Sequence, residues 1–368
     1  MSKRTLARLS LLALAGLSAV AAGQASAANP PPARIRGVWM HPGQFGPDRT
    51  AALEKIRATL DAYEAAGIDT VIMLVKDTAG YVYYPSRIAL RPPQWEAWDF
   101  FGEFLAEARS RKMTVHAWFC VFPESSVLGA VREHPEWLIR SPRREIVAAA
   151  NPALPEVRAY ERSLMMEVVA RYRLDWVHLD YIRFPCEPTE PFFSFDAETL
   201  RLFQEYSGVD LAAVKAHDSG NMIWNEWLSW NRDQVTRFVR ELRESLRAFG
   251  WSVRISAAVF PDEANARVLI GQDWAAWARE GLVDMLCPML YTNHAAFFEK
   301  FTRRAVEVGR GLCRVCPGIG IGTSHNQNTP DGMAEQMRIG RDLGADGVVF
   351  FSGGSLKEPF LEKLKAIR

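Results

Sequence analysis

Residues 175–185 read DWVHLDYIRFP, and this stretch carries more information about the chain than any other. Its alternation predicts a buried strand with Val177, Leu179 and Tyr181 on one face and His178 and Asp180 on the other. An unpaired carboxylate buried near the end of such a strand lowers the stability of the fold. We therefore expect Asp180 to take part in chemistry.

Strand-like and helix-like segments alternate along the rest of the chain. Strands are expected at residues 35–40, 70–76, 114–122, 175–184, 253–260, 285–291, 314–321 and 347–351. Helices are expected at residues 50–65, 98–110, 156–172, 224–249, 273–280, 295–308 and 332–343, and at the C-terminus. Eight largely apolar strands, each followed by a helix, predict a single (β/α)8 TIM barrel. The alternative, an open doubly wound sheet, lacks support because no GxGxxG turn follows the first strand.

The first residues have the features of a secretory signal peptide. A basic start is followed by an apolar run over about residues 9–22 and by small residues up to Ala27, which predicts cleavage after residue 27. A Pro-rich leader then covers residues 28–34, and the barrel covers residues 35–368. The apolar run is short for a membrane span, and no Cys near the cut would carry a lipid. We expect a periplasmic or extracellular protein that is not stably inserted in a membrane after cleavage.

Charge and cysteine content exclude several classes of function. The chain has 44 basic and 43 acidic residues with no basic stripe, so a nucleic-acid partner is not expected. Its five Cys are an odd number, so at least one thiol stays unpaired even if a disulfide forms. Cys313 and Cys316 have CxxC spacing, but positions three apart in a strand face opposite ways, and no second ligand pair is present. We expect no metal and no cofactor.

Polar residues follow every predicted strand. The C-terminal strand ends of a barrel meet at one rim, where barrel enzymes have their active sites. The residues that reach this rim are His41, Lys76, Asp77, Glu124, Asp180, Arg183, Asp262, Glu263, Tyr291, Asn293, His294, Ser324, His325 and Ser352. Long segments at residues 125–153 and 186–221, after strands three and four, are expected to lie over the same mouth.

Converging carboxylates at an aromatic mouth are what glycoside hydrolysis requires. One carboxylic acid protonates the leaving oxygen, and an ionised carboxylate attacks the sugar or activates water. We expect Asp180 to be the key catalytic carboxylate, with Glu124 or Asp262 as its partner. Polar neighbours such as Arg183 favour an ionised Asp180, whereas Phe122 beside Glu124 favours a protonated acid there.

Each of these carboxylates also has a structural interpretation. Asp180 would form a buried ion pair with Arg183 or Arg254. Glu124 would be a solvated loop residue or would help to cap a helix N-terminus. Asp262 would open the next helix.

Aromatic and polar side chains near the same strand ends are candidates for binding sugar, since flat rings stack on pyranoses and polar groups meet hydroxyls. These substrate-binding candidates are Trp39, Lys76, Trp118, His178, Arg183, Tyr291 and Asn293. His178 has a second interpretation, as an interior histidine that orients Asp180.

Several motifs resemble those of the bacterial glycosyl-hydrolase-like 10 family. They are RGVW at 36–39, VHAWF at 115–119, HPEW at 134–137, NP at 151–152, VHLDYIRFP at 177–185 and DMLCPMLY at 284–291. The resemblance implies a (β/α)8 barrel and an exported enzyme acting on polysaccharide, with peptidoglycan strands as the substrate of some members. The chain differs from the usual pattern at Tyr181, where members often have a second acidic residue, and at the end of strand three.

The function expected from these features is an exported glycoside hydrolase that cleaves O-glycosidic bonds in a polysaccharide, with bacterial cell-wall glycan among the candidate substrates. One alternative is a catalytically inactive, glycan-binding barrel, which would keep the aromatic mouth without a working carboxylate pair. Another is a metal-dependent hydrolase or deacetylase, which would need a His/Asp ligand cluster that the sequence does not display.

Overall fold

The computed structural model describes residues 34–125, 127–141, 143, 145–186, 193–211 and 218–367. The expected signal peptide and nearly all of the expected leader lie outside the described residues.

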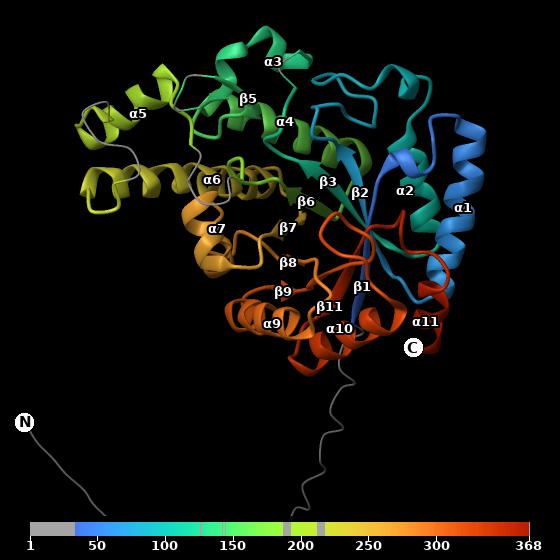
Figure 1. The fold of residues 1–368 in the computed structure, drawn as a ribbon. Coiled ribbons are helices and arrows are strands. Elements are labelled where there is room, and N and C mark those ends of the chain that lie inside the picture. Colours follow the sequence, from blue (N-terminus) through green and yellow to red (C-terminus); the bar gives the residue numbers. More distant parts are fainter. Residues whose placement is uncertain are drawn as a thin grey trace, which may run out of the picture. The chain divides into compact units, whose positions relative to one another are not determined.

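The described part of the chain forms a closed barrel of eight parallel strands (Figure 1). Its strands are β1 (Ile35–Met40), β2 (Thr70–Lys76), β3 (Thr114–Cys120), β6 (Trp176–Asp180), β7 (Arg254–Val259), β8 (Met285–Leu290), the two pieces β9 (Arg314–Val315) and β10 (Gly318–Gly320), and β11 (Gly347–Phe351). Sheet order follows chain order, and pairing of β10 with both β8 and β11 closes the ring. The predicted (β/α)8 barrel is confirmed.

Most helices cover the outside of this barrel, and two lie in the long segments after β3 and β6 (Figure 1). They are α1 (Arg49–Ala65), α2 (Phe100–Ser110), α3 (Gly129–Glu133), α4 (Pro155–Tyr172), α5 (Ala197–Ser207), α6 (Met222–Ala248), α7 (Glu263–Leu269), α8 (Trp274–Arg279), α9 (Ala295–Gly309), α10 (Pro330–Asp342) and α11 (Phe360–Ala366). Helix α1 shows why they form: Asp48 caps its first turn by accepting the Ala51 N–H, and its buried face includes Ile56 and Leu60. Among the described residues, no helix combines the length and the apolar character needed to cross a membrane.

Two expected strands differ from the observed ones. The strand predicted at 314–321 is interrupted at Pro317, which has no backbone N–H to donate, although β9 and β10 both stay in register with β8. The strand predicted at 175–184 ends at Asp180, because Tyr181 adopts a left-handed backbone with φ of 49°. This early end places Asp180 at the rim.

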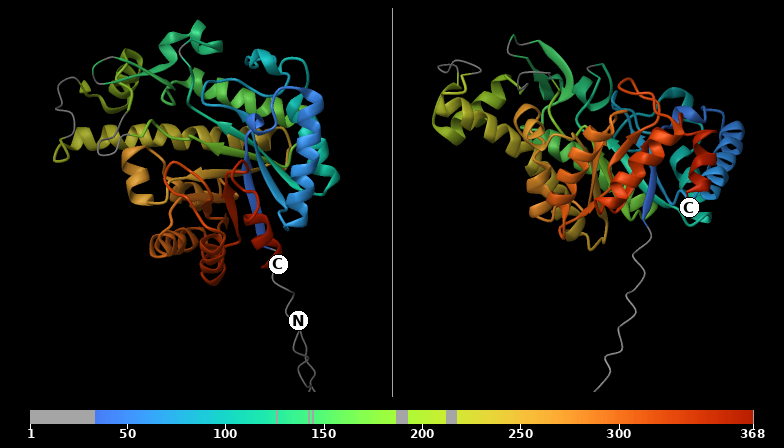
Figure 2. Two further views of the ribbon diagram at one scale, coloured as in Figure 1. Left: turned by 45° about the vertical axis from the view of Figure 1, so that its right-hand side comes forward. Right: turned by 60° about the horizontal axis from the view of Figure 1, so that its bottom comes forward.

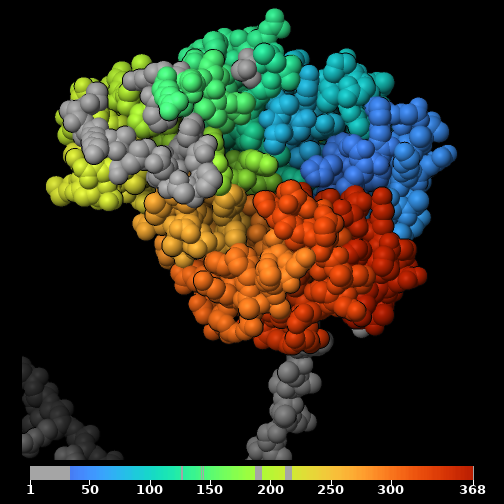
Figure 3. Space-filling view, in the orientation of Figure 1, coloured from blue at the N-terminus to red at the C-terminus, as the bar shows by residue number. Residues whose placement is uncertain are grey.

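The two long segments contain secondary structure that the sequence did not predict. The segment after β3 carries α3 and an antiparallel hairpin of β4 (Leu138–Arg140) and β5 (Ile146–Ala150). The segment after β6 carries α5, which lies with the start of α6 beyond the barrel in both views of Figure 2. In Figure 3 these segments form the green and yellow-green part of the surface.

Two apolar clusters follow from the alternation of the barrel strands. The outer cluster lies between strands and helices and includes Val177 and Leu179 of β6. The inner cluster fills the barrel and includes Trp39, Trp118 and Trp176. Because His178 and Asp180 share the face of Trp176, the barrel interior is where this strand presents its polar groups.

Candidate active site

A cavity of about 1040 Å³ opens at the C-terminal ends of the barrel strands. Polar side chains in its lining are His41, Asp77, Thr78, Asp180, Arg183, Thr323, Ser324 and His325. Aromatic side chains in its lining are Tyr83, Trp118, Tyr181, Phe260, Tyr291, Phe297 and Phe351. The rim expected from the sequence is therefore a cavity with both polar and aromatic walls.

Asp180 lies in this lining and is nearly covered, with 6% of its surface exposed. Its Oδ1 accepts the backbone N–H of Tyr181 at 2.6 Å and Nη1 of Arg183 at 3.3 Å. Burial raises the pKa of Asp180, and the positive charge of Arg183 and the Tyr181 N–H oppose that rise without cancelling it. A raised pKa favours the protonated form of Asp180, whereas its polar neighbours in the sequence suggested the ionised form.

Arg183 is fixed by aromatic rings as well as by Asp180. Its guanidinium carbon lies 4.3 Å from the centre of the Tyr181 ring and 4.8 Å from that of Phe260. Such cation–π contacts hold the flat guanidinium in one orientation. Arg183 therefore sits in the lining, as a substrate-binding candidate should, and is also the neighbour that counteracts burial at Asp180.

Asp77 is the other carboxylate among the described residues of the lining. Its Oδ1 accepts the backbone N–H groups of Ala79 at 2.9 Å and Tyr81 at 3.0 Å. Its Oδ2 accepts the hydroxyl of Tyr83 at 3.1 Å. The loop that follows β2 thus wraps around this side chain and fixes it at the mouth.

Aromatic rings form the walls on either side of the cavity. The rings of Tyr291 and Phe351 stack with centres 5.0 Å apart and an interplanar angle of 17°. Trp118 meets His41 edge-on at 4.7 Å, and burial lowers the pKa of His41 so that its ring favours the neutral form. Trp118 and Tyr291 are therefore placed where the sequence predicted sugar-stacking residues.

Trp39 and His178, two further substrate-binding candidates, lie below the cavity instead of in its lining. Trp39 Nε1 donates to His178 Nε2 at 3.0 Å, and His178 Nδ1 and His116 Nδ1 each lie 2.8 Å from the hydroxyl of Ser256. Burial lowers the pKa of His178 to about 3. These side chains form a neutral polar layer inside the barrel, below the cavity.

Lys76 is also absent from the lining, because a bulge turns it out of the barrel. The β2–β3 register shifts between Leu74 and Lys76, so Leu74 pairs with the inward-facing Trp118 but Lys76 pairs with Phe119, which packs outside. There Lys76 Nζ lies 2.9 Å from Glu124 and 3.0 Å from Glu161.

Glu124 is therefore held in a fully buried ion cluster outside the cavity lining. Burial opposes the charge on Lys76, but the two glutamates outweigh it and raise the pKa of the ammonium. Burial likewise raises the pKa of Glu161, which favours one proton on this net-negative cluster. Lys76 Nζ also donates to the carbonyls of Cys120 and Val121, so the cluster ties the end of β2 to the end of β3.

Asp262 and Asn293 are the remaining candidates, and both make local contacts. Asp262 caps α7 by accepting the N–H of Asn265 at 3.1 Å, which matches its structural interpretation. Asn293 is exposed, and its amide donates to the carbonyl of Gln327 at 2.9 Å. Both lie near the rim but outside the described lining of the cavity.

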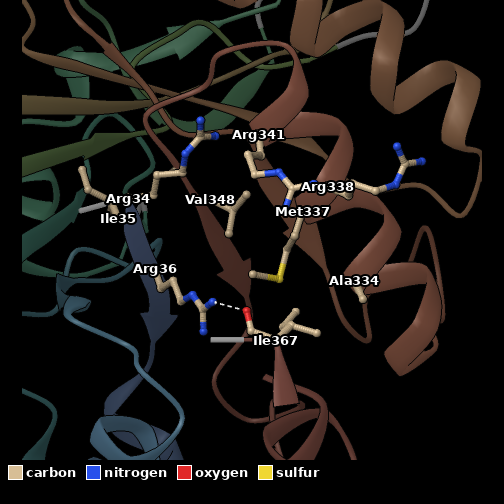
Figure 4. A pocket seen from close by; sticks show the side chains of 10 residues that line it. Arg34, Ile35, Arg36, Ala334, Met337, Arg338, Arg341, Val348 and Ile367 are labelled. Carbon is tan, nitrogen blue, oxygen red and sulfur yellow. Dashed lines mark hydrogen bonds between the residues drawn. The ribbon is translucent and has the colours of Figure 1, made fainter. Parts of the chain in front are cut away.

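A second hollow, of about 340 Å³, lies at the opposite ends of β1 and β11 (Figure 4). Its arginines are already engaged: Arg36 donates to the carbonyls of Ala66, Leu364 and Ile367, and Arg338 and Arg341 pair with Asp342. These contacts hold the first strand against the C-terminal helix, a stabilising role that is usual for this end of the fold. Within the described ranges, no cluster of three or more His, Cys, Asp or Glu could bind a metal ion.

The structure adds residues that the sequence did not single out. Asp77 was one of many rim residues, and its local signal is the turn Thr78–Ala79–Gly80 directly after a strand. Phe260 and Phe351 end their strands but carried no polar signal. Glu161 lies on a helix far along the chain from Lys76, so no sequence pattern links the two.

The geometry of this mouth can be compared with known proteins. A family model described as glycosyl hydrolase-like 10 matches residues 34–336. The chain belongs to this family. Curated relatives carry glycosyl hydrolase names: YngK of Bacillus subtilis is 24% identical over 70% of this chain, and DigH of Escherichia coli K12 is 26% identical over 63%. The chain spans about half the length of these relatives, 54% of YngK and 56% of DigH.

Solved structures show the same fold as this family member. The glycoside hydrolase domain of PgaB (BpsB) from Bordetella bronchiseptica superposes with a TM-score of 0.74 at 15% identity, over 90% of this chain and 98% of that one. Alpha-L-fucosidase isoenzyme 2 from Paenibacillus thiaminolyticus gives a TM-score of 0.65 at 15% identity, over 90% of this chain and 48% of that one. At these identities the likeness extends to the barrel alone.

Proposed function

We propose that this protein is an exported glycoside hydrolase that cleaves O-glycosidic bonds in a polysaccharide, with bacterial cell-wall glycan as the first substrate to test, and that Asp180 is its proton donor. The placement of Asp180 carries the proposal: a nearly buried carboxyl group at the C-terminal end of β6, in the lining of a large aromatic cavity. Family membership and the names of the curated relatives support the hydrolase class. Export rests on the signal-peptide pattern of residues 1–27.

The proposed chemistry depends on the proton that this carboxyl group holds. A general acid must hold its proton until the glycosidic oxygen needs it, and burial raises the pKa of Asp180 in that direction. The proton passes to the leaving oxygen as the bond to the anomeric carbon breaks, and water completes the hydrolysis. The partly exposed rings of Tyr291 and Phe351 offer aromatic surface for neighbouring sugar units, whereas only 3% of the Trp118 surface is exposed.

The decisive experiment measures turnover by wild type and Asp180→Asn on denuded peptidoglycan strands and on a panel of α- and β-linked polysaccharides. We expect wild type to release new reducing ends and Asp180→Asn to lose roughly 100-fold to 10,000-fold in rate while remaining folded by circular dichroism.

The matched control is Asp262→Asn, which changes a carboxylate near the same rim that caps α7. Because Asn caps helices about as well as Asp, this variant should fold and keep its activity. Loss of activity in Asp262→Asn with full activity in Asp180→Asn would contradict the assignment. Binding of glycan without cleavage by wild type would instead support the inactive, glycan-binding barrel.

A further inference from the structure

Most glycoside hydrolases use a second carboxylate within reach of the first. Among the described residues, the cavity lining contains Asp180 and Asp77 as its carboxylates. Glu124 is paired with Lys76 outside the lining, and Asp262 caps a helix. Asp77 is therefore the remaining candidate for the second carboxylate of the described lining.

Asp77 is held by groups that donate hydrogen bonds to it. Two are the backbone N–H groups of Ala79 and Tyr81, which can only donate. The third is the hydroxyl of Tyr83: burial, and then the charge of Asp77, raise the pKa of this phenol, so it keeps its proton and donates it. Three donors therefore point at this carboxyl group, and its oxygens act as hydrogen-bond acceptors.

Asp77 and Asp180 lie at the ends of β2 and β6, the two strands that flank β3. Asp77 follows Lys76, which pairs with β3, and Asp180 pairs with Cys120 of the same strand. Both carboxylates lie close enough to the Cys120 thiol to influence its pKa. Burial raises this pKa most, and the negative charges of Asp180 and, to a smaller extent, Asp77 raise it further. Neighbouring strands lie about 4.8 Å apart, so backbones two strands apart are separated by roughly 10 Å.

Backbones this far apart are compatible with the wider of the two known spacings of catalytic carboxyl groups. Acid and base in inverting glycosidases lie roughly 6.5–9.5 Å apart, which leaves room for a water molecule, whereas acid and nucleophile in retaining enzymes lie only about 5–5.5 Å apart. Both oxygens of Asp77 are also already hydrogen-bonded to its own loop, which suits contact through water better than direct attack on carbon.

We propose that Asp77 is the second catalytic carboxylate of this mouth and acts as the general base in an inverting hydrolysis. The inference rests on the proposed function. Asp77 removes a proton from water as the water oxygen bonds to the anomeric carbon. The bond from that carbon to the leaving oxygen breaks, and the leaving oxygen takes the proton of Asp180. Each turnover thus consumes one water molecule and leaves Asp77 protonated and Asp180 ionised, and exchange with solvent restores both.

The first test is the configuration of the product. Proton NMR during the first minutes of wild-type turnover, on the panel polysaccharide that is cleaved, should show the anomer opposite to that of the substrate. A product of retained configuration would overturn the assignment of Asp77 as a base.

The second test uses Asp77→Asn and sodium azide. Asn keeps an Oδ1 that can accept the Ala79 and Tyr81 N–H groups, so the loop should keep its fold. We expect Asp77→Asn to lose at least roughly 100-fold in rate and to recover part of it with azide, giving a glycosyl azide detectable by mass spectrometry, because azide needs no base.

Three outcomes separate this inference from the proposed function. No cleavage by wild type on any panel member would contradict the proposed function itself. Cleavage by wild type with near-normal activity of Asp77→Asn would overturn only the role of Asp77. Loss of activity without formation of a glycosyl azide, in a variant whose unfolding midpoint matches wild type, would also overturn it and leave Asp77 as a loop-forming residue.

Discussion

Two opposing effects act on the pKa of the Asp180 carboxyl group. Burial disfavours the charged form, while Arg183 and the Tyr181 N–H favour it. Because burial prevails, the pKa is raised, which is the direction that a general acid requires. Arg183 therefore lowers the pKa of the carboxyl group that we propose as the acid.

This balance predicts the effect of Arg183→Met on the pH profile. A general acid must be protonated, so kcat/KM falls as pH rises through the pKa of Asp180. Removing the guanidinium raises that pKa further, so the basic limb of the profile should move to higher pH, whatever happens to the maximal rate. Arg183→Lys, which keeps the charge, should move it less. A basic limb that shifts to lower pH in Arg183→Met would show that another group controls it.

At the scale of an element, the loop after β2 connects the mouth to the buried ion cluster. It begins at Asp77, bridges back from Val82 to Lys76, and passes over Glu124 at Gly80. Gly80 has a φ of +92°, and a Cβ there would come within 1.9 Å of Glu124 Oε2. Only glycine satisfies both demands, the backbone conformation and the close approach.

Gly80→Ala should therefore destabilise the protein and lower its activity through Asp77. The left-handed backbone alone costs an alanine about 1–2 kcal/mol, and the contact with Glu124 adds to this. Gly46→Ala is the matched control, because Gly46 has a similar φ of +85° but no atom lies within 4 Å of the point that its Cβ would occupy. Denaturant unfolding should show a larger loss for Gly80→Ala, with activity kept in Gly46→Ala. Equal losses of stability would mean that the loop yields to the added methyl group.

At the scale of the whole molecule, the barrel depends on neutral histidines in its interior. His178 and His116 share the hydroxyl of Ser256, and burial lowers the pKa of both rings. The unfolded chain binds a proton at such a ring below about pH 6.5, whereas folded His178 does so only near pH 3. Acid therefore favours the unfolded state, and this contribution to stability is lost as pH falls from 6.5 toward 3.

The His178→Gln variant isolates this effect. Between about pH 7.5 and pH 5, the free energy of unfolding of wild type should fall by about 2 kcal/mol more than that of His178→Gln. The variant will be less stable at neutral pH, because it loses hydrogen bonds to Trp39 and Ser256, so the measurement is the pH dependence and not the absolute value. Equal slopes for both proteins would mean that His178 is protonated in the folded state.

The sequence by itself determined the barrel, the order of its strands and the face of β6 that carries Asp180. These follow from local patterns: apolar alternation along β6, a polar residue after each strand, and helices between strands. The rim is then a consequence of topology, because parallel strands place all their C-terminal ends on one side.

Only the tertiary structure decided which rim residues share the cavity. The bulge before Lys76 comes from hydrogen bonding between β2 and β3, and it turns the side chain to the opposite face with no mark in the sequence. The depth of Trp39 and His178 depends on how eight strands are staggered, and the partnership of Lys76 with Glu161 on how α4 packs on them. The alternation of side chains between the two faces is set within one strand. The depth, pairing and burial of a side chain are set by contacts between elements, and the raised pKa of Asp180 follows from those contacts.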